Sequence, residues 1–163
     1  MVFARVQSND FSQQQLYDEL AADSVLQGAG AIVTFTGLVR DFNAQGGIQG
    51  IELEYYPGMT ESALEALLAQ ASQRFDIVDA GIVHRVGKLG SHAQIVWVGT
   101  ASQHREQAFL AATYIMDMLK QSVPIWKKEW QDDEACWVAA KADDDKAAMR
   151  WLSAEKGPLC NKA

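Results

Sequence analysis

The stretch IVWVGTASQHREQAFLAATYIMDMLKQSVPIWKKEW, residues 95–130, predicts a strand, a helix and a second strand in succession. It opens with the β-branched and aromatic run of residues 95–99, which favours a strand. The helix should end near Val123, because Pro124 disfavours helical geometry in the residue before it, and residues 125–130 then have the pattern of the next strand. Apolar residues between the two strands recur at helical spacing and predict one buried stripe, formed by Phe109, Ala112, Ile115, Met116 and Leu119.

The segments before and after this stretch also alternate between strand and helix patterns. Helices are expected after the capping residues Ser12 and Thr60, and a short terminal helix is expected at residues 143–151. Hairpins interspersed with helices favour the α+β class over a doubly wound parallel sheet. Further strands are expected at residues 2–6, 30–40, 51–55, 80–86, 93–100 and 135–140, a mobile loop at residues 41–47, and turns at residues 87–90 and 131–134.

Length and composition predict one domain with a core of its own. The chain has 163 residues, of which 48% are hydrophobic, and no linker divides it. We therefore expect a single domain over residues 1–152, with mixed and antiparallel sheets and about three main helices. Residues 153–163 should form a frayed tail.

The charge of the chain limits the kinds of partner that its whole surface can bind. A formal net charge of −7 argues against nucleic acid and anionic membranes. No apolar run approaches the roughly 20 residues that span a bilayer, and the first residues do not resemble a signal peptide. With only two cysteines, Cys136 and Cys160, we expect a cytoplasmic protein with reduced thiols.

Basic side chains within or beside apolar segments of this acidic chain predict a local anion site. His104 and Arg105 open the predicted helix of residues 106–121, where positive charge opposes the helix dipole unless a negative ligand lies nearby. The candidate residues for this site are Arg40, His104, Arg105, Lys120, Lys127 and Lys128.

Each of these residues also has a purely structural interpretation. Lys120 falls in the last helical turn, where the dipole favours a cation whether or not a ligand binds. Strand alternation places Lys127 and Lys128 on opposite faces, and Lys128 is the better candidate for a charge that protects an exposed strand edge. Arg40 ends a strand before a glycine-containing loop, so it is either solvated or a clamp for an anion.

Other site types have weaker support in the sequence. His84 and His92 lack a third ligand at metal spacing, so we expect no metal site. Cys136 lies between Ala135 and Trp137 in a predicted strand, which favours a buried apolar filler. No Walker loop, GxGxxG fingerprint or GxSxG elbow is present, and we expect no cofactor.

Five segments together resemble the large, catalytic subunit of molybdopterin synthase. Their order and length make the resemblance specific, and they cover most of residues 30–151. The segments are VTFTGLVRDFN (33–43), LEYYPGMTE (53–61), IVHRVGKL (82–89), SQHREQAF (102–109) and YIMDMLKQSVPIWKKE (114–129).

The resemblance implies a fold, a reaction and partners. The fold would be of the α/β-hammerhead type, in a homodimer that forms a heterotetramer with two copies of a small ubiquitin-like sulfur carrier. The substrate would be cyclic pyranopterin monophosphate, which gains two sulfur atoms to become the dithiolene of molybdopterin. The sulfur would arrive as a thiocarboxylate on the carrier's C-terminal Gly-Gly tail.

The resemblance also implies roles for individual residues. Lys120 and Lys127 would be catalytic, and Lys141 would occupy the position of a residue that reaches across the dimer. Phe35 and Met116 would form an apolar pocket wall. Substrate-binding positions would be Leu38, Val39, Arg40, His104, Arg105, Lys120, Lys127, Lys128 and Glu129.

The sequence departs from the family pattern at two positions. Leu38 stands where many relatives carry a lysine, and Lys141 stands where an arginine is common. Two other classes of function remain open from the residues alone. One is a phosphate-ester hydrolase or lyase that needs no protein partner, and the other is a non-catalytic anion-binding module.

Overall fold

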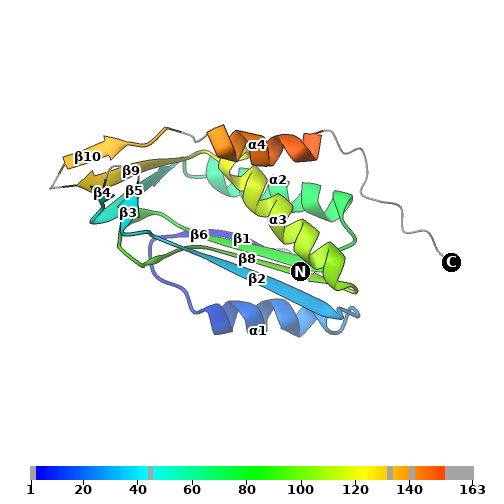
Figure 1. Cartoon of the computed structure of the whole chain (residues 1–163). Coiled ribbons are helices and arrows are strands. Elements are labelled where there is room, and N and C mark those ends of the chain that lie inside the picture. Colours follow the sequence, from blue (N-terminus) through cyan, green and yellow to red (C-terminus); the bar gives the residue numbers. More distant parts are fainter. Residues whose placement is uncertain (1–2, 44–45, 132–133, 140–141, 153–163) are drawn as a thin grey trace.

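The computed structural model describes residues 3–43, 46–131, 134–139 and 142–152 (Figure 1). Most strand pairs in these ranges are antiparallel and helices are interspersed among them, so the predicted α+β class is confirmed. The described ranges contain four helices, one more than the expected three. The fourth, α4 (Ala142–Leu152), is the short terminal helix predicted at residues 143–151.

The first sheet is mixed and has the strand order β1-β6-β8-β2. Strand β1 runs parallel to β6, and the other neighbours are antiparallel. The predicted strand patterns in these segments are therefore confirmed. The strands are β1 (Phe3–Gln7), β2 (Ala31–Leu38), β6 (Asp79–Arg85) and β8 (Gln94–Ser102).

Helices cover both faces of the first sheet (Figure 1). On one face Val83 and Trp97 pack toward α1 (Gln13–Ser24). Apolar residues of β6 and β8 on the other face, Ile82 and Val98 among them, pack against α2 (Met59–Arg74) and α3 (Arg105–Ser122). Because side chains alternate between two buried faces, β6 and β8 are apolar almost throughout.

The second sheet is antiparallel and has the order β10-β9-β5-β7. Residues 87–90, expected as a turn, instead form β7, because Gly87 at φ 84° redirects the chain and lets these residues pair with β5. The expected loop at residues 41–47 contains a short pair of strands, β3 and β4. The bounds are β3 (Phe42–Asn43), β4 (Gly46–Gly47), β5 (Gly50–Tyr55), β7 (Gly87–Gly90), β9 (Ile125–Gln131) and β10 (Glu134–Trp137).

The position of β10 at the edge of this sheet corrects one expectation. Cys136, predicted to be a buried filler, is exposed, as are the other residues of β10. Strand β10 lies at the sheet edge and all four of its residues are exposed, so no other element in the described part of the chain covers either of its faces.

Local sequence signals fix where the helices start and stop. The backbone N–H of Gln15 donates to the Ser12 hydroxyl at 3.3 Å, which confirms the predicted cap of α1. Thr60 does not cap α2; its hydroxyl accepts from the Tyr56 N–H at 3.1 Å and donates to the Pro124 carbonyl at 2.9 Å. This contact joins the start of α2 to the chain just after α3, where Pro124 ends the helix as predicted.

Candidate functional site

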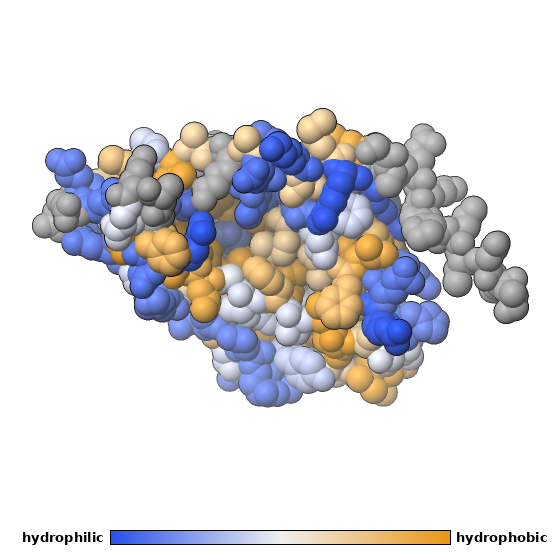
Figure 2. Space-filling view, in the orientation of Figure 1, coloured by the Kyte–Doolittle hydropathy of each residue, from blue (hydrophilic) through white to orange (hydrophobic). Residues whose placement is uncertain are grey.

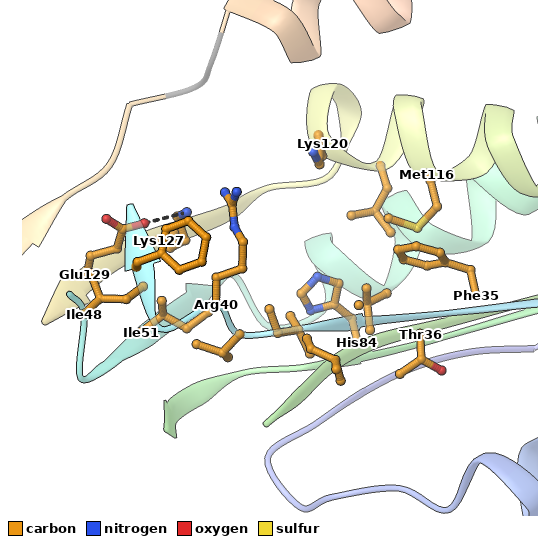
Figure 3. A pocket seen from close by; sticks show the side chains of 17 residues that line it. Phe35, Thr36, Arg40, Ile48, Ile51, His84, Met116, Lys120, Lys127 and Glu129 are labelled. Atoms are coloured by element: carbon orange, nitrogen blue, oxygen red, sulfur yellow. Dashed lines mark hydrogen bonds and ion pairs between the residues drawn. The ribbon is translucent and has the colours of Figure 1, made fainter. Parts of the chain in front are cut away.

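A cleft lies where the end of α3 faces both sheets. It has two neighbouring parts, with volumes of about 580 Å³ and about 460 Å³. Both volumes fall within the size range of small-molecule sites. The two parts form one cleft, because they share a wall made by Arg40, Ile51, His84, Ile95, Leu119, Lys120 and Lys127. Figure 3 shows the larger part.

Three predicted cations meet in this cleft, each delivered by a different part of the fold. Arg40 follows the end of β2, Lys120 lies in the last turn of α3, and Lys127 lies on β9. Alternation along β9 places Lys127 on the same face as Ile125, as the sequence predicted. The predicted convergence of basic residues is therefore observed for these three side chains.

Carboxylates hold both lysines in the cleft. The Lys120 ammonium lies 2.7 Å from Asp144 Oδ1 of α4, and the Lys127 ammonium lies 3.0 Å from Glu129 Oε1. Arg40 has no ion pair or side-chain hydrogen bond within the described part of the chain. An entering anion therefore meets one uncommitted guanidinium and two ammonium groups whose present partners it can replace.

Apolar side chains form much of the remaining wall. Phe35 and Leu38 of β2 and Met116 of α3 line the larger part of the cleft, and Phe35 and Leu38 are 43% and 52% exposed. Hydrophobic residues gather on the face of the molecule formed by β2 and α3 (Figure 2). Val39 also lines the cleft but is only 2% exposed, and its backbone N–H and carbonyl bond to Ala93 and His92.

His104 and Arg105 do not reach this cleft within one chain. They start α3, as predicted, and both are exposed there. Lys120 lies fifteen residues further along the same helix, roughly 22 Å away at 1.5 Å per residue. Within one chain these two residues therefore lie apart from Lys120 and Lys127, because a straight helix separates its two ends. Their part in substrate binding stays a prediction.

Lys128 also points away from the cleft. It lies on the opposite face of the second sheet, where its ammonium pairs with Glu54 Oε1 at 2.5 Å and lies 4.2 Å from the centre of the Trp137 ring. Its expected role in protecting a strand edge is also wrong, because β9 has a neighbour on both sides. Lys141 and Cys160 lie outside the described residues.

Two ionisable residues of the cleft were not predicted as part of it. Asp144 comes to Lys120 only because α4 docks on α3, which no local pattern indicates. His84 was considered only as a metal ligand, although its alternation with Ala80 and Ile82 along β6 indicated a position on a buried face. Among the described residues, no group of three or more His, Cys, Asp or Glu side chains is placed to hold a metal ion.

No helix in the described ranges is long and apolar enough to cross a membrane.

Residues 6–122 match the family described as MoaE protein. A molybdopterin synthase catalytic subunit from Cereibacter sphaeroides is 52% identical over 124 residues, which cover 76% of this chain and 84% of that protein.

Solved structures share the fold. The molybdopterin biosynthesis MoaE protein from Burkholderia ambifaria has a TM-score of 0.80 and 42% identity, covering 94% of this chain and 100% of that chain. A chain from the complex of subunits 1 and 2 of molybdopterin-converting factor from Helicobacter pylori has a TM-score of 0.70, over 85% of this chain and 91% of that chain. At 17% identity, this second likeness shows the fold alone.

Proposed function

Because the chain belongs to the MoaE protein family, we propose that it is the catalytic subunit of a molybdopterin synthase and acts in molybdenum cofactor biosynthesis. The observation that carries this proposal is the meeting of Arg40, Lys120 and Lys127 in one cleft of a chain with net charge −7. Such a cleft concentrates positive charge where an anionic substrate binds. The reaction is sulfur transfer to cyclic pyranopterin monophosphate, which forms the dithiolene of molybdopterin.

The lysines supply electrostatic stabilisation in this reaction. Lys120 and Lys127 polarise the thiocarboxylate of the carrier and stabilise the negative charge that develops as its sulfur is transferred. Arg40 binds the phosphate, for which its guanidinium offers paired donors. Asp144 and Glu129 keep the two ammonium groups within the cleft until the anions arrive.

The sulfur donor in this proposal is a small ubiquitin-like subunit with a C-terminal Gly-Gly thiocarboxylate. The Helicobacter pylori chain of the same fold comes from a two-subunit complex of molybdopterin-converting factor. An extended tail of two glycines is narrow enough to enter beside Phe35 and Leu38, whose exposed apolar side chains can pack along it.

A homodimer gives His104 and Arg105 a place in the same mechanism. One chain holds them about a helix length from Lys120, so they take part in substrate binding only if a second copy brings its α3 N-terminus to the cleft. Lys141 is proposed to cross the same interface. The heterotetramer would then consist of two catalytic chains and two carriers.

Further features of the proposal concern the chain as a whole. Residues 1–152 are proposed as the catalytic domain, with the α/β-hammerhead architecture of the family. The tail predicted at residues 153–163 lies outside the described residues. We also propose that the protein acts in the cytoplasm, as its low cysteine content predicts.

The test is turnover with purified components. The chain, thiocarboxylated carrier and cyclic substrate should give the dithiolene product, whereas the chain with a persulfide donor and no carrier should give none. Lys120→Ala should keep the fold and lower turnover at least ~100-fold, because it removes a charge that stabilises the transition state. Product without carrier, or cleavage of the cyclic phosphate by the chain alone, would instead support a partner-independent enzyme.

A further inference from the structure

His84 is a buried histidine that projects into the cleft. It lies near the end of β6, on the sheet face that Ala80 and Ile82 share, and it lines both parts of the cleft. Only 5% of the residue is exposed. Figure 3 shows its ring in the space that Arg40 and Lys120 also face.

The hydrogen bond of His84 fixes which ring nitrogen carries the proton. Nδ1 lies 2.8 Å from the carbonyl oxygen of Arg85, and a carbonyl can only accept, so Nδ1 is the donor. Burial lowers the pKa of His84 to about 4, although the bond to Arg85 opposes this shift. The ring is therefore neutral near neutral pH, and Nε2 carries a free lone pair.

This lone pair has no partner within the described part of the chain. Nε2 is not sealed from solvent, and because His84 lines the cleft, Nε2 opens to the cleft. A buried acceptor aimed into a cavity is suited to a ligand that donates a hydrogen bond.

The other polar side chains of the cleft do not offer a neutral acceptor. Arg40, Lys120 and Lys127 can only donate. Glu129 and Asp144 are acidic, and each forms an ion pair with a lysine through one carboxylate oxygen. Thr36 points away from the cleft (Figure 3). It lies on the α1 side of the first sheet, beside Trp97, its pairing partner on β8.

We propose that His84 is a specificity-determining residue, whose Nε2 accepts a hydrogen bond from an N–H group on the uncharged heterocycle of the substrate. This inference rests on the proposed function, which supplies a substrate with both an anionic phosphate and a ring that carries N–H donors. The cations bind the anionic end, where a lone pair would only repel charge. The neutral acceptor orients the ring, and a substrate that lacks the donor leaves Nε2 buried and unpaired.

A pair of substitutions at His84 separates the loss of the hydrogen-bond acceptor from the loss of packing. His84→Gln carries an amide oxygen at about the reach of Nε2, whereas His84→Leu fills the site without an acceptor. We expect His84→Leu to raise KM for the cyclic substrate at least ~10-fold, and His84→Gln to restore most of that loss. KM for the thiocarboxylated carrier should stay the same in both variants, and His92→Asn, at an exposed histidine, should match the wild type.

A spectroscopic measurement on the wild-type protein does not depend on how the variants fold. The ¹⁵N spectrum of labelled histidine should show His84 protonated at Nδ1, with an Nε2 signal that moves when the cyclic substrate is added. Inorganic phosphate alone should leave that signal in place, because it binds only the cations.

The outcomes distinguish this inference from the proposed function. Wild-type turnover with an unmoved Nε2 signal, or equal KM for the wild type and His84→Leu, would overturn the role of His84 and leave the enzyme assignment standing. An Nε2 signal that moves with the cyclic substrate, in a protein that makes no dithiolene with the carrier, would uphold the role of His84 and refute the sulfur transfer.

Discussion

Lys127 and Lys128 are neighbours in sequence but have opposite environments. Lys127 faces the cleft and pairs with Glu129, whereas Lys128 lies on the other face of the sheet beside Glu54 and Trp137. Strand alternation alone produces this difference, because successive side chains of β9 point to opposite sides. The two lysines therefore form a matched pair for testing which charge the chemistry requires.

Lys127→Ala should lower turnover by at least ~100-fold, because it removes a cation from the reacting centre. Lys128→Ala removes the same charge from the chain and should stay within about threefold of the wild type. Initial rates at saturating carrier and substrate measure both. Equal losses in the two variants would contradict the assignment of the cleft as the reacting centre.

His84 should make the stability of the protein depend on pH. Its pKa falls from 6.5 to about 4 on burial, so between these values the unfolded chain binds a proton that the folded chain does not. The stability that the neutral ring contributes is fully present at pH values above the pKa of the unfolded state. It is lost as the pH falls toward the pKa of the folded state. The loss reaches on the order of 3 kcal/mol.

Urea unfolding between about pH 7 and about pH 5 measures this dependence. The wild type should lose more stability over that range than His84→Gln, which has no titrating group at the site. The charged groups that face the ring, Arg40, Lys120 and Lys127, are present in both proteins and cancel in the comparison. Parallel curves would mean that His84 does not stay neutral in the folded state.

Helix α4 is the element that connects the periphery of the fold to the cleft. Its Asp144 forms the ion pair with Lys120, and its Asp145 accepts a hydrogen bond of 2.8 Å from the Gln121 side chain. The Trp151 indole N–H donates to the Asp117 carboxylate at 2.8 Å. The Trp151 ring completes an aromatic cluster with Phe75 and Tyr114, with ring centres 5.7 Å and 5.4 Å away. Docking of α4 therefore determines where Asp144 lies relative to Lys120.

Trp151→Ala should cost about 2 kcal/mol of stability, because it removes a partly buried ring and its hydrogen bond. Leu152→Ala is the control, since Leu152 is 75% exposed and should change stability by less than about 0.5 kcal/mol. Urea denaturation gives both values, and hydrogen exchange should show lower protection across α4 in the first variant only. Equal stabilities of the two variants would refute the docking role of Trp151.

Elements with a strong local pattern could be predicted from the sequence, and contacts between distant elements could not. The stop at Pro124 and the alternation along β9 were confirmed, and they place Lys120 and Lys127 correctly. The buried stripe predicted on α3 was confirmed at Ala112, Ile115 and Leu119 but was wrong at Phe109, which is 60% exposed. Strand β7 was not predicted because residues 87–90 have the sequence GKLG, which is typical of a turn. These residues form a strand only because they pair with β5. The Asp144 contact and the exposure of Cys136 depend on neighbours that lie far away in the sequence.

In the arrangement of the whole chain, two of the predicted basic residues lie outside the cleft. His104 and Arg105 lie exposed at the first turn of α3, while Lys120 lies at the other end of that helix. Arg105 has no acidic partner within the described part of the chain. In a symmetric dimer, contacts occur twice, so two copies can each bring this turn to the other's cleft.

Mixing two inactive variants tests whether the site is shared. Arg105→Ala and Lys120→Ala should each be nearly inactive as separate dimers. After unfolding and refolding together, half of the dimers are mixed, and each mixed dimer has one intact cleft if Arg105 acts across the interface. Activity should then return to roughly a quarter of the wild-type value.

The matched control mixes Lys120→Ala with Lys127→Ala, whose altered residues line the cleft of the same chain. A mixed dimer of these two variants has one defect in each cleft, so no activity should return. Recovery in the first mixture and none in the second requires that Arg105 and Lys120 act together from different copies. If the first mixture stays inactive although mixed dimers form, Arg105 does not act across the interface, and the cations at the start of α3 have no role in the cleft.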